Sequence, residues 1–364
     1  MVSDSLLCST NQLGSQSGAG LVVTNQLKAQ AQVFDSIKTM DGIIINPSSY
    51  GVPSDPFFID YVASEIVRTK QYKVDVAHFN GDPFYRTTEE LRKLNNTFII
   101  TDCTAHDLKE SIHEWETVTG FYPFKHMINP FLYDLYMRHV KTADIVLVPS
   151  RLSKTWIIDN LKVPKEKIKM IRHGTLLIDQ RPLPDEFRVG YLGAIGPDKG
   201  LKYLFQAWAM FNGDGRLRLA GSNTPNLTDW RSKVIQHNPK SKIDLVGFVD
   251  IKWDFYQDCS VYVQPSVTEA FGIPLLEAMA SGRPVIASRG VGSAELVKDN
   301  RDGILFDARD DKALLAAIQY FHDNPSEIKR MGDNAAQTAG RHSWDNIQKK
   351  YIKLYNEILQ ERSK

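Results

Sequence analysis

Short apolar runs rich in β-branched residues alternate with amphipathic stretches along the whole chain. Such runs predict buried strands, and the amphipathic stretches predict the helices that cover them. Repeated alternation of this kind favours parallel sheets covered by helices, so the expected fold class is α/β. In the first half, the strand-like runs are residues 6–8, 42–45, 74–77, 97–101, 144–148 and 167–171.

A change of pattern divides the chain into two expected domains. Residues 179–184 contain two prolines and predict a linker, and a second series of strand-like runs begins at residue 188. A chain of 364 residues also exceeds what one hydrophobic core usually supports. We therefore expect one domain over residues 1–182, another over 183–342, and a helix in the tail 343–364. The apolar positions at helical spacing in that tail are Ile347, Tyr351, Leu354, Tyr355 and Ile358.

Charge balance and cysteine spacing narrow the class of protein. The chain has 44 basic and 43 acidic residues and no basic block, so no nucleic-acid partner is indicated. We see no signal-peptide pattern and no apolar run long enough to span a bilayer. Cys8, Cys103 and Cys259 lie far apart and make no metal or redox spacing, which favours a reduced, cytoplasmic compartment. Peripheral membrane contact is compatible with the sequence, which does not indicate it.

Residues 261–307 carry the strongest chemical pattern. Glu269 and Glu277 stand with seven residues between them, which include a Phe271–Gly272 turn and Pro274 at the expected start of a helix. The outward N–H groups and the positive dipole end of such a helix start make a ready phosphate site. Two acids on either side of a phosphate suit the hydroxyl groups of a nucleotide sugar, in which a diphosphate joins ribose and sugar.

The same segment also fits an ordinary buried α/β unit. Residues 261–263 and 285–287 predict strands, and residues 273–280 predict a mostly buried helix that ends at Ser281–Gly282. An acid on a buried helix needs a partner, because burial of an unpaired carboxylate is expensive. A ligand hydroxyl would supply that partner to Glu277, which favours the functional interpretation.

On these motifs, the chain resembles the GT-B-fold retaining glycosyltransferases of family 4, the glycosyl transferases group 1. The hallmark of the family is the E-x7-E segment, here Glu269 and Glu277. The resemblance implies two Rossmann-like domains that face an interdomain cleft, the first on the acceptor side and the second binding a nucleotide sugar. It also implies that the C-terminal helix packs back on the first domain. The other matching motifs are ADIVLVPS at 143–150, YLGAIGPDKGLKYLFQAW at 191–208, LAGSN at 219–223, LVGFVD at 245–250 and DGILF at 302–306.

The resemblance implies roles for the donor-site residues. Glu269 would hold hydroxyl groups of the donor sugar, Glu277 would bind the ribose, and Lys199 would neutralise the diphosphate leaving group. The catalytic residues are then expected to be Glu269, Lys199 and His78. The other expected donor-binding residues are Ala270, Phe271, Gly272, Gly193, Gly221 and Phe248.

One position departs from the family pattern. The family carries an arginine directly after the glycine of the first strand of this domain, in G-R-L-x-x-x-K-G, where this chain has Ala194. We expect another basic group to substitute for that cation, with Arg172, Arg283 and Arg289 near the expected strand ends as candidates. A divalent ion and a weakened or altered enzyme are the alternatives. No metal site is indicated, and we expect no required cofactor beyond the nucleotide-sugar donor.

The first domain is expected to supply the acceptor side. Gly14, Gly18 and Gly20 follow the first strand with the spacing G-x3-G-x-G, which differs from the dinucleotide fingerprint. The equivalent loop of the family approaches the donor phosphates and the acceptor, whereas the alternative is an ordinary flexible loop. His78 follows the strand expected at 74–77 and resembles a histidine found there in many relatives, although a lone histidine is more often structural.

Two further features of the first half stay open at the level of sequence. The usual second histidine of the family is replaced within residues 101–104; Asp102 and His106 lie near, and neither is assigned that role. Residues 126–140 predict a core-facing helix, for which acceptor or membrane contact is the alternative interpretation.

Taken with the resemblance, the sequence predicts a retaining glycosyltransferase. It would move a sugar from a UDP- or GDP-sugar to a hydroxyl of a carbohydrate, lipid-linked or other acceptor, with positioning and preorganised charge carrying the rate. The alternatives are a nucleotide-sugar epimerase, a phosphorylase on the same scaffold and, because of Ala194, a non-catalytic nucleotide-sugar-binding protein. An NAD-dependent oxidoreductase fits poorly, because the chain lacks the glycine fingerprint and the acidic residue expected after it.

Overall fold

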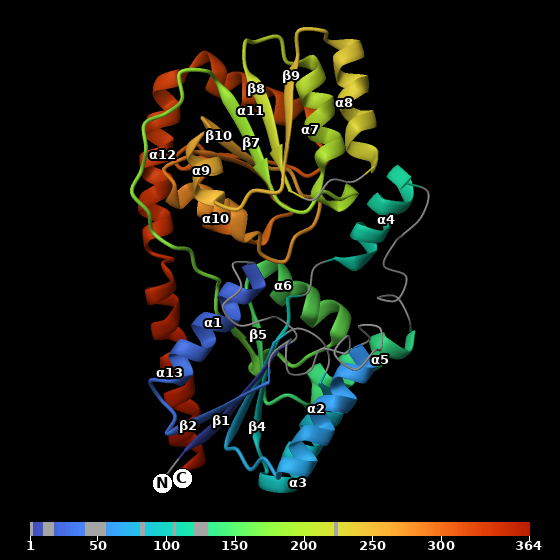
Figure 1. Cartoon of the computed structure of the whole chain (residues 1–364), viewed down its shortest axis with the longest axis vertical. Coiled ribbons are helices and arrows are strands. Elements are labelled where there is room, and N and C mark those ends of the chain that lie inside the picture. Colours follow the sequence, from blue (N-terminus) through green and yellow to red (C-terminus); the bar gives the residue numbers. More distant parts are fainter. Residues whose placement is uncertain are drawn as a thin grey trace. The chain divides into compact units, whose positions relative to one another are not determined.

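The computed structural model describes residues 3–9, 18–40, 56–80, 84–104, 107–119, 130–221 and 225–364. The chain forms two compact units, and each is described by itself. Unit 1 comprises residues 1–105, 123–173 and 344–364, and unit 2 comprises residues 106–122 and 174–343. Each unit contains a six-stranded sheet with flanking helices (Figure 1), so the α/β fold class predicted from the alternating pattern is confirmed.

The sheet of unit 1 has the strand order β2-β1-β3-β4-β5-β6, and every neighbouring pair is parallel. Its central strands are buried on both faces, which explains why they read as continuous apolar runs. The elements before the tail are β1 (Asp4–Ser9), α1 (Gly18–Gln30), β2 (Ser36–Met40), α2 (Pro56–Lys70), β3 (Val76–Asn80), α3 (Tyr85–Asn95), β4 (Phe98–Asp102), α5 (Pro130–Thr142), β5 (Ile145–Val148), α6 (Arg151–Trp156), η3 (Ile157–Leu161), η4 (Lys165–Lys167) and β6 (Ile168–Met170).

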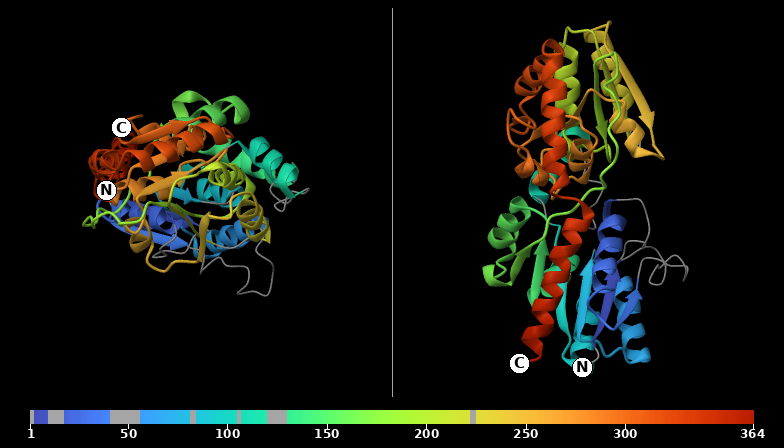
Figure 2. Two further views of the ribbon diagram at one scale, coloured as in Figure 1. Left: turned by 90° about the horizontal axis from the view of Figure 1, so that it is seen from above. Right: turned by 90° about the vertical axis from the view of Figure 1, so that its left-hand side faces the viewer.

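The tail of the chain forms a long helix, α13 (Trp344–Arg362), that belongs to unit 1. Figure 2 shows α13 running beside α1, and the two helices are in contact. The Tyr355 ring meets the Phe34 ring edge-on, with 5.6 Å between the ring centroids. The apolar positions read from the sequence, Ile347, Tyr351, Leu354, Tyr355 and Ile358, are all buried.

The sheet of unit 2 has the strand order β12-β11-β10-β7-β8-β9 and is again parallel throughout. Its core contains the fully buried Trp208 and Tyr191. The elements after α4 are β7 (Arg188–Leu192), η5 (Pro197–Lys199), α7 (Leu201–Met210), β8 (Arg216–Ala220), α8 (Pro225–His237), β9 (Lys242–Gly247), α9 (Lys252–Gln257), β10 (Val261–Gln264), α10 (Ile273–Ala280), β11 (Val285–Ser288), η6 (Gly292–Leu296), β12 (Gly303–Phe306), α11 (Asp311–Asp323) and α12 (Pro325–Gly340).

Helix α4 (Leu108–Thr119) follows β4 of unit 1 along the chain but packs within unit 2. It lies against η5, where Trp115 hydrogen-bonds to Asp198, and Glu114 forms an ion pair with Arg309. The sequence predicts residues 1–182 as one domain, whereas the structure groups residues 106–122 with unit 2. Side-chain pairing across a long sequence separation causes this difference, and no local pattern signals it.

Some of the strand, helix and cap positions predicted in the first half of the chain agree with the structure, and others do not. The run predicted at 42–45 lies outside the described residues, and β2, whose short sequence SIKTM is mostly polar, was not predicted. The helix predicted from Leu21 begins at Gly18. Ser150 caps α6 as predicted, because its side chain accepts the Ser153 N–H at 3.1 Å.

Candidate functional site

The carboxyl ends of the unit 2 strands meet at one edge of the sheet, because all of the strands are parallel. Gly193 follows β7 and Gly221 follows β8, and both were predicted to be site residues. A Cβ on Gly221 would lie only 1.9 Å from the carbonyl oxygen of Gly193, and the φ of Gly221 is +145°. A side chain is therefore excluded at Gly221, so backbone lines this part of the edge.

Another glycine brings Lys199 to the same edge. Gly200 has a φ of +70°, and a Cβ there would lie 2.0 Å from the carbonyl oxygen of Pro265. The carbonyl of Asp198 accepts the Val267 N–H at 2.8 Å, which ties η5 to the loop that follows β10. This close backbone packing makes Lys199 a neighbour of that loop.

Lys199 and Glu269 form the central ion pair of the site. Lys199 Nζ lies 2.5 Å from Glu269 Oε2 and 3.6 Å from Asp198 Oδ2. The Lys199 and Glu269 side chains are 18% and 23% exposed, so water still reaches both. Burial by itself would lower the pKa of Lys199, but the carboxylates of Glu269 and Asp198 outweigh it and raise that pKa above its ordinary value. Lys199 is therefore a fixed cation at neutral pH.

The backbone of Glu269 is braced like a short strand. Its N–H donates to the carbonyl of Gly290, and its carbonyl accepts the Gly292 N–H, each at 3.0 Å. The residue therefore cannot move far without breaking two backbone hydrogen bonds. This bracing fixes the carboxylate next to Lys199.

The turn from Glu269 leads through a glycine into α10, and the anion site predicted there stays a prediction. Gly272 caps the helix with a φ of +85°, and a Cβ there would lie 2.8 Å from Val291 Cγ1. Pro274 lies at the second position of α10 rather than at the first. Ala270 and Phe271 are 7% and 3% exposed, so this turn offers mainly its backbone to a ligand.

Glu277 lies on α10 and is 3% exposed. Its carboxylate accepts the Tyr256 hydroxyl at 2.8 Å and forms an ion pair with Lys252. The sequence predicts a ligand hydroxyl as the partner of this buried acid, whereas the structure provides two protein partners. The ribose-binding role of Glu277 stays a prediction.

Phe248 follows β9 at the same sheet edge and is 83% exposed. It comes directly after Gly247, whose φ of +77° turns the chain there. An aromatic ring that projects into water at a strand end is available to a flat ligand group. Its donor-binding assignment stays a prediction.

The candidates to replace the arginine expected at position 194 differ in availability. Arg283 is 2% exposed and donates to three backbone carbonyls, so it serves the fold. Arg289 follows β11 at the same edge as Glu269, and its half-exposed side chain pairs with Asp299 at 3.2 Å. Arg172 belongs to unit 1. Arg289 is therefore the best-placed candidate within unit 2.

The site residues predicted in the first domain fall in unit 1. Gly14 lies outside the described residues, and Gly18 and Gly20 lie in the first turn of α1. His78 is completely buried on β3, where its Nδ1 lies 2.7 Å from the Tyr355 hydroxyl. Its other ring nitrogen faces a carboxylate, so both nitrogens are engaged within the protein. The catalytic assignment of His78 stays a prediction.

Asp102 is the carboxylate that faces His78. Its Oδ1 lies 3.1 Å from His78 Nε2, while Gln26 and Asn80 each donate an amide N–H to Oδ2 at 2.5 Å. Burial would raise the pKa of Asp102, but the imidazole and the amide donors outweigh it and hold that pKa below its ordinary value. Asp102 therefore stays ionised and organises a buried polar cluster.

Sequence reasoning missed several residues around the candidate site. Asp198 lies inside the recognised motif next to Lys199, and its acidic side chain could have been weighed there. Lys252 and Tyr256 lie on a short helix four residues apart, which gives only a weak signal of a shared partner. Trp115 carries no signal at all, because its contact with Asp198 arises from the passage of α4 into unit 2.

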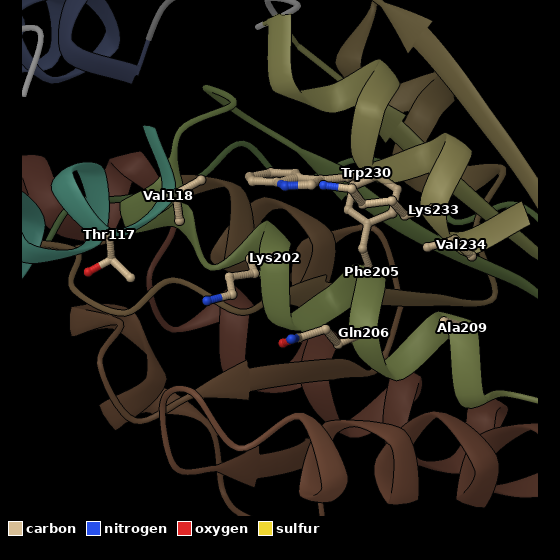
Figure 3. A pocket seen from close by; sticks show the side chains of 9 residues that line it. All are labelled: Thr117, Val118, Lys202, Phe205, Gln206, Ala209, Trp230, Lys233 and Val234. Carbon is tan, nitrogen blue, oxygen red and sulfur yellow. The ribbon is translucent and has the colours of Figure 1, made fainter. Parts of the chain in front are cut away.

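A separate pocket of about 370 Å³ lies between α4, α7 and α8 (Figure 3). None of the predicted site residues lines it. Among the described residues, no group of three or more His, Cys, Asp or Glu side chains is arranged to hold a metal ion. In that same part of the chain, every helix is too short or too polar to cross a bilayer. The pocket is lined by Thr117, Val118, Lys202, Phe205, Gln206, Ala209, Trp230, Lys233 and Val234.

One protein family and several known sequences match parts of the chain. Residues 177–338 match the family described as glycosyl transferases group 1. An uncharacterized glycosyltransferase of Methanocaldococcus jannaschii is 30% identical over 221 residues, which make up 59% of this chain and 60% of that protein. A D-inositol 3-phosphate glycosyltransferase of Corynebacterium urealyticum is 35% identical over 103 residues, 28% of this chain and 24% of that protein. The chain thus spans less than two thirds of either relative.

Solved structures resemble the chain over nearly its whole length. Sucrose-phosphate synthase from Thermosynechococcus elongatus has a TM-score of 0.79 at 21% identity, covering 99% of this chain and 100% of that one. Anabaena HepE, solved in complex with UDP-glucose, has a TM-score of 0.71 at 17% identity, covering 97% and 99%. Likeness at such identities concerns the fold, which is the two-sheet GT-B architecture. With the order of motifs in unit 2, residues 177–338 therefore form a domain of the glycosyl transferases group 1 family.

Proposed function

We propose that the protein is a retaining glycosyltransferase that moves a sugar from a nucleoside-diphosphate sugar to an acceptor hydroxyl. The observation that carries this proposal is the 2.5 Å pair of Lys199 and Glu269, directly before the first turn of α10. A cation and a carboxylate at a helix start suit a ligand in which a diphosphate joins a sugar. The family match and the UDP-glucose bound to HepE support the same class of donor.

In the proposed reaction, the donor diphosphate replaces Glu269 as the partner of Lys199. Departure of the nucleoside diphosphate builds negative charge, and a fixed ammonium group lowers that barrier. Glu269, released from Lys199, accepts hydrogen bonds from hydroxyl groups of the donor sugar. The ribose hydroxyls would share Glu277 with Lys252 and Tyr256, so the buried acid keeps partners whether or not the donor is bound.

Retention is proposed to follow from reaction on a single face of the sugar. The leaving phosphate takes the proton of the acceptor hydroxyl as the new glycosidic bond forms. No protein nucleophile is needed, and the protein contributes positioning and preorganised charge. We propose a carbohydrate hydroxyl as the acceptor, and a lipid-linked acceptor at a membrane surface is the alternative that an acceptor panel would test.

A non-catalytic nucleotide-sugar-binding protein is the second candidate. Ala194 favours it, because the leaving phosphates then meet Lys199 with one cation fewer than the family pattern provides. Such a protein would bind the donor and release neither free sugar nor glycosylated product. An epimerase would convert the donor sugar with no acceptor present, and a phosphorylase would release a sugar phosphate only when inorganic phosphate is added.

The proposal is tested with UDP-, GDP- and ADP-glucose, first by thermal shift and then with a panel of sugar acceptors. A true donor at about 100 times its Kd should add about 2.7 kcal/mol of stability. Product NMR reports the anomeric configuration, and EDTA should leave the rate unchanged. Lys199→Ala should abolish turnover and Glu277→Ala should weaken donor binding, while Lys233→Ala, at an exposed helix position, changes neither. Wild-type transfer rates in Lys199→Ala would refute the site.

A further inference from the structure

Helix α4 contacts the Lys199–Glu269 pair from two sides, through the neighbour of each residue. On one side, Trp115 donates its Nε1–H to Asp198 Oδ1 at 3.0 Å. The other carboxylate oxygen of Asp198 lies 3.6 Å from Lys199 Nζ. Asp198 is 8% exposed, so its hydrogen bond to the indole is made largely out of water. Trp115 therefore fixes the carboxylate that helps to orient Lys199.

The packing of the Trp115 ring is a second sign of this fit. A Cβ on Gly196 would lie 3.0 Å from Trp115 Cζ2 and 2.8 Å from Asp198 Oδ1. The indole therefore lies close against bare backbone just before η5. A side chain at Gly196 would separate α4 from Asp198.

On the other side, the start of α4 reaches the loop that carries Glu269. The N–H of Asp107, directly before the helix, donates to Thr268 Oγ1 at 3.1 Å. Thr268 precedes Glu269, whose backbone is already braced on both sides. One helix thus holds the residue next to the cation and the residue next to the carboxylate.

A third set of contacts anchors α4 itself. Glu114 is 2% exposed, and its carboxylate accepts from Arg309 Nε at 2.6 Å and from the Tyr203 hydroxyl at 3.2 Å. Arg309 also forms an ion pair with Glu110. The φ of Arg309 is +72°, in the left-handed region that side-chain-bearing residues seldom adopt. The backbone at Arg309 is therefore strained where its side chain holds α4.

We propose that α4 is a positioning helix for the donor site and that Trp115 is its positioning residue. Through Asp198 and Thr268, the helix holds Lys199 and Glu269 in their paired geometry. In that geometry Lys199 is in place to neutralise the leaving diphosphate. This role rests on the proposed function for its effect on turnover, whereas its effect on Lys199 itself needs no substrate. Trp115 acts through Asp198 and carries out no chemical step.

The first test removes the indole N–H and keeps an aromatic ring. Trp115→Phe should lower kcat roughly tenfold, because one hydrogen bond to a charged group is worth about that factor. The KM for the donor should stay within about twofold, because Glu277 and the turn at α10 are untouched. A fall in stability alone, with both kinetic constants unchanged, would overturn the proposal.

A matched control and a double-mutant cycle separate positioning from general damage. Trp230→Phe makes the same chemical change in the pocket beside α4 (Figure 3) and should leave kcat unchanged. In a protein that already carries Asp198→Asn, adding Trp115→Phe should lower kcat by at most about another twofold. Trp115 acts only through Asp198, so its effect is already lost in that background. Additive losses in that cycle would refute action through Asp198.

The start of α4 provides a second arm should Trp115→Phe fold poorly. Thr268→Val removes the oxygen that accepts the Asp107 N–H, whereas Thr268→Ser keeps it. The valine variant should lose several-fold in kcat, and the serine variant should retain wild-type turnover. Equal rates in the two variants would argue against this contact.

A readout free of donor chemistry distinguishes failure of this proposal from failure of the proposed function. Acetic anhydride labelling, followed by peptide mass spectrometry, reports the accessibility and protonation of Lys199. In wild-type protein the paired ammonium should react slowly, and Trp115→Phe should speed its labelling several-fold, while Trp230→Phe should not. Unchanged labelling overturns the positioning role. Faster labelling in a protein that transfers no sugar would uphold that role and reject the transferase.

Discussion

Lys252 and Glu277 form an ion pair inside unit 2, with side chains that are 17% and 4% exposed. The second carboxylate oxygen of Glu277 accepts the Tyr256 hydroxyl at 2.8 Å. A buried carboxylate is tolerated only when its hydrogen bonds are satisfied, and α9 supplies both partners here. The predicted ribose-binding acid is therefore also a structural link between α9 and α10.

Loss of Lys252 should cost stability because it leaves Glu277 buried beside a single donor. Lys252→Met should lower the free energy of unfolding by roughly 3 kcal/mol, the size typical of breaking a buried pair from one side. Lys242→Met removes a cation from the exposed pair with Asp214 and should cost less than about 1 kcal/mol. Urea denaturation of the two variants measures the difference, and equal losses would contradict the buried pair.

The close approach of Gly200 to Pro265 predicts a severe effect of one added methyl group. Gly200→Ala would place a Cβ 2.0 Å from the Pro265 carbonyl oxygen at a φ of +70°. We expect a loss of more than about 2 kcal/mol of stability and a displaced Lys199 with little turnover. Gly340→Ala, at a helical position with open space around it, should be neutral or stabilising by up to about 1 kcal/mol. Thermal unfolding compares the stability of the two variants. Wild-type stability in Gly200→Ala would contradict the close packing of Gly200 against Pro265.

The sequence pattern predicted the fold class well where strands are buried on both faces. The runs 145–148 and 285–287 are continuously apolar because both faces of these strands are buried, and both strands lie inside their sheets. The edge strand β2 has only five residues, three of them polar, so it gave no strand signal and was not predicted. The passage of α4 into unit 2 was not predictable either, because it depends on the pairing of Glu114 with Arg309 far along the chain.

The candidate site was predictable where a motif carries its own geometry. Lys199 and Glu269 lie 70 positions apart, yet the order of parallel strands places both at one sheet edge, and the structure brings them together. The partners of Glu277 could not be read from the sequence, because a ligand and a protein side chain satisfy a carboxylate equally well. The interdomain cleft implied by the resemblance stays a prediction.

A buried histidine in unit 1 predicts how stability responds to acid. His139 lies edge-on to Phe79 with its Nε2 2.9 Å from the Thr101 hydroxyl, and burial lowers its pKa from 6.5 to about 3. Between these values the unfolded chain binds the proton and the folded chain does not, so the unfolding free energy falls as the pH falls. This group should remove up to about 1.4 kcal/mol per pH unit below about pH 6.5. His173, whose pKa burial lowers to about 4, acts in the same direction.

Substitution of His139 isolates its share of that pH dependence. His139→Gln keeps a polar side chain but cannot take up the proton. Urea titrations near about pH 7 and about pH 5 should therefore show a smaller loss of unfolding free energy in the variant than in the wild type. The slope of the unfolding free energy against pH should differ between variant and wild type by about one bound proton. An equal slope in the two proteins would contradict the buried neutral imidazole.

Arg309 combines a strained backbone with an ion pair to the buried Glu114, and two substitutions separate these contributions. Arg309→Ala and Arg309→Gly both leave Glu114 without its guanidinium partner, so both should unfold more easily than the wild type by roughly 2–4 kcal/mol.

At a φ of +72° glycine is unstrained whereas alanine is not, so Arg309→Gly should be the more stable variant by about 1 kcal/mol. The exposed helical position Lys329 provides the control, because there alanine should be more stable than glycine by about 1 kcal/mol. Urea unfolding of the four variants tests this reversal. The same order at both positions would mean that the backbone of Arg309 carries no strain, and the ion pair with Glu114 alone would then account for its contribution.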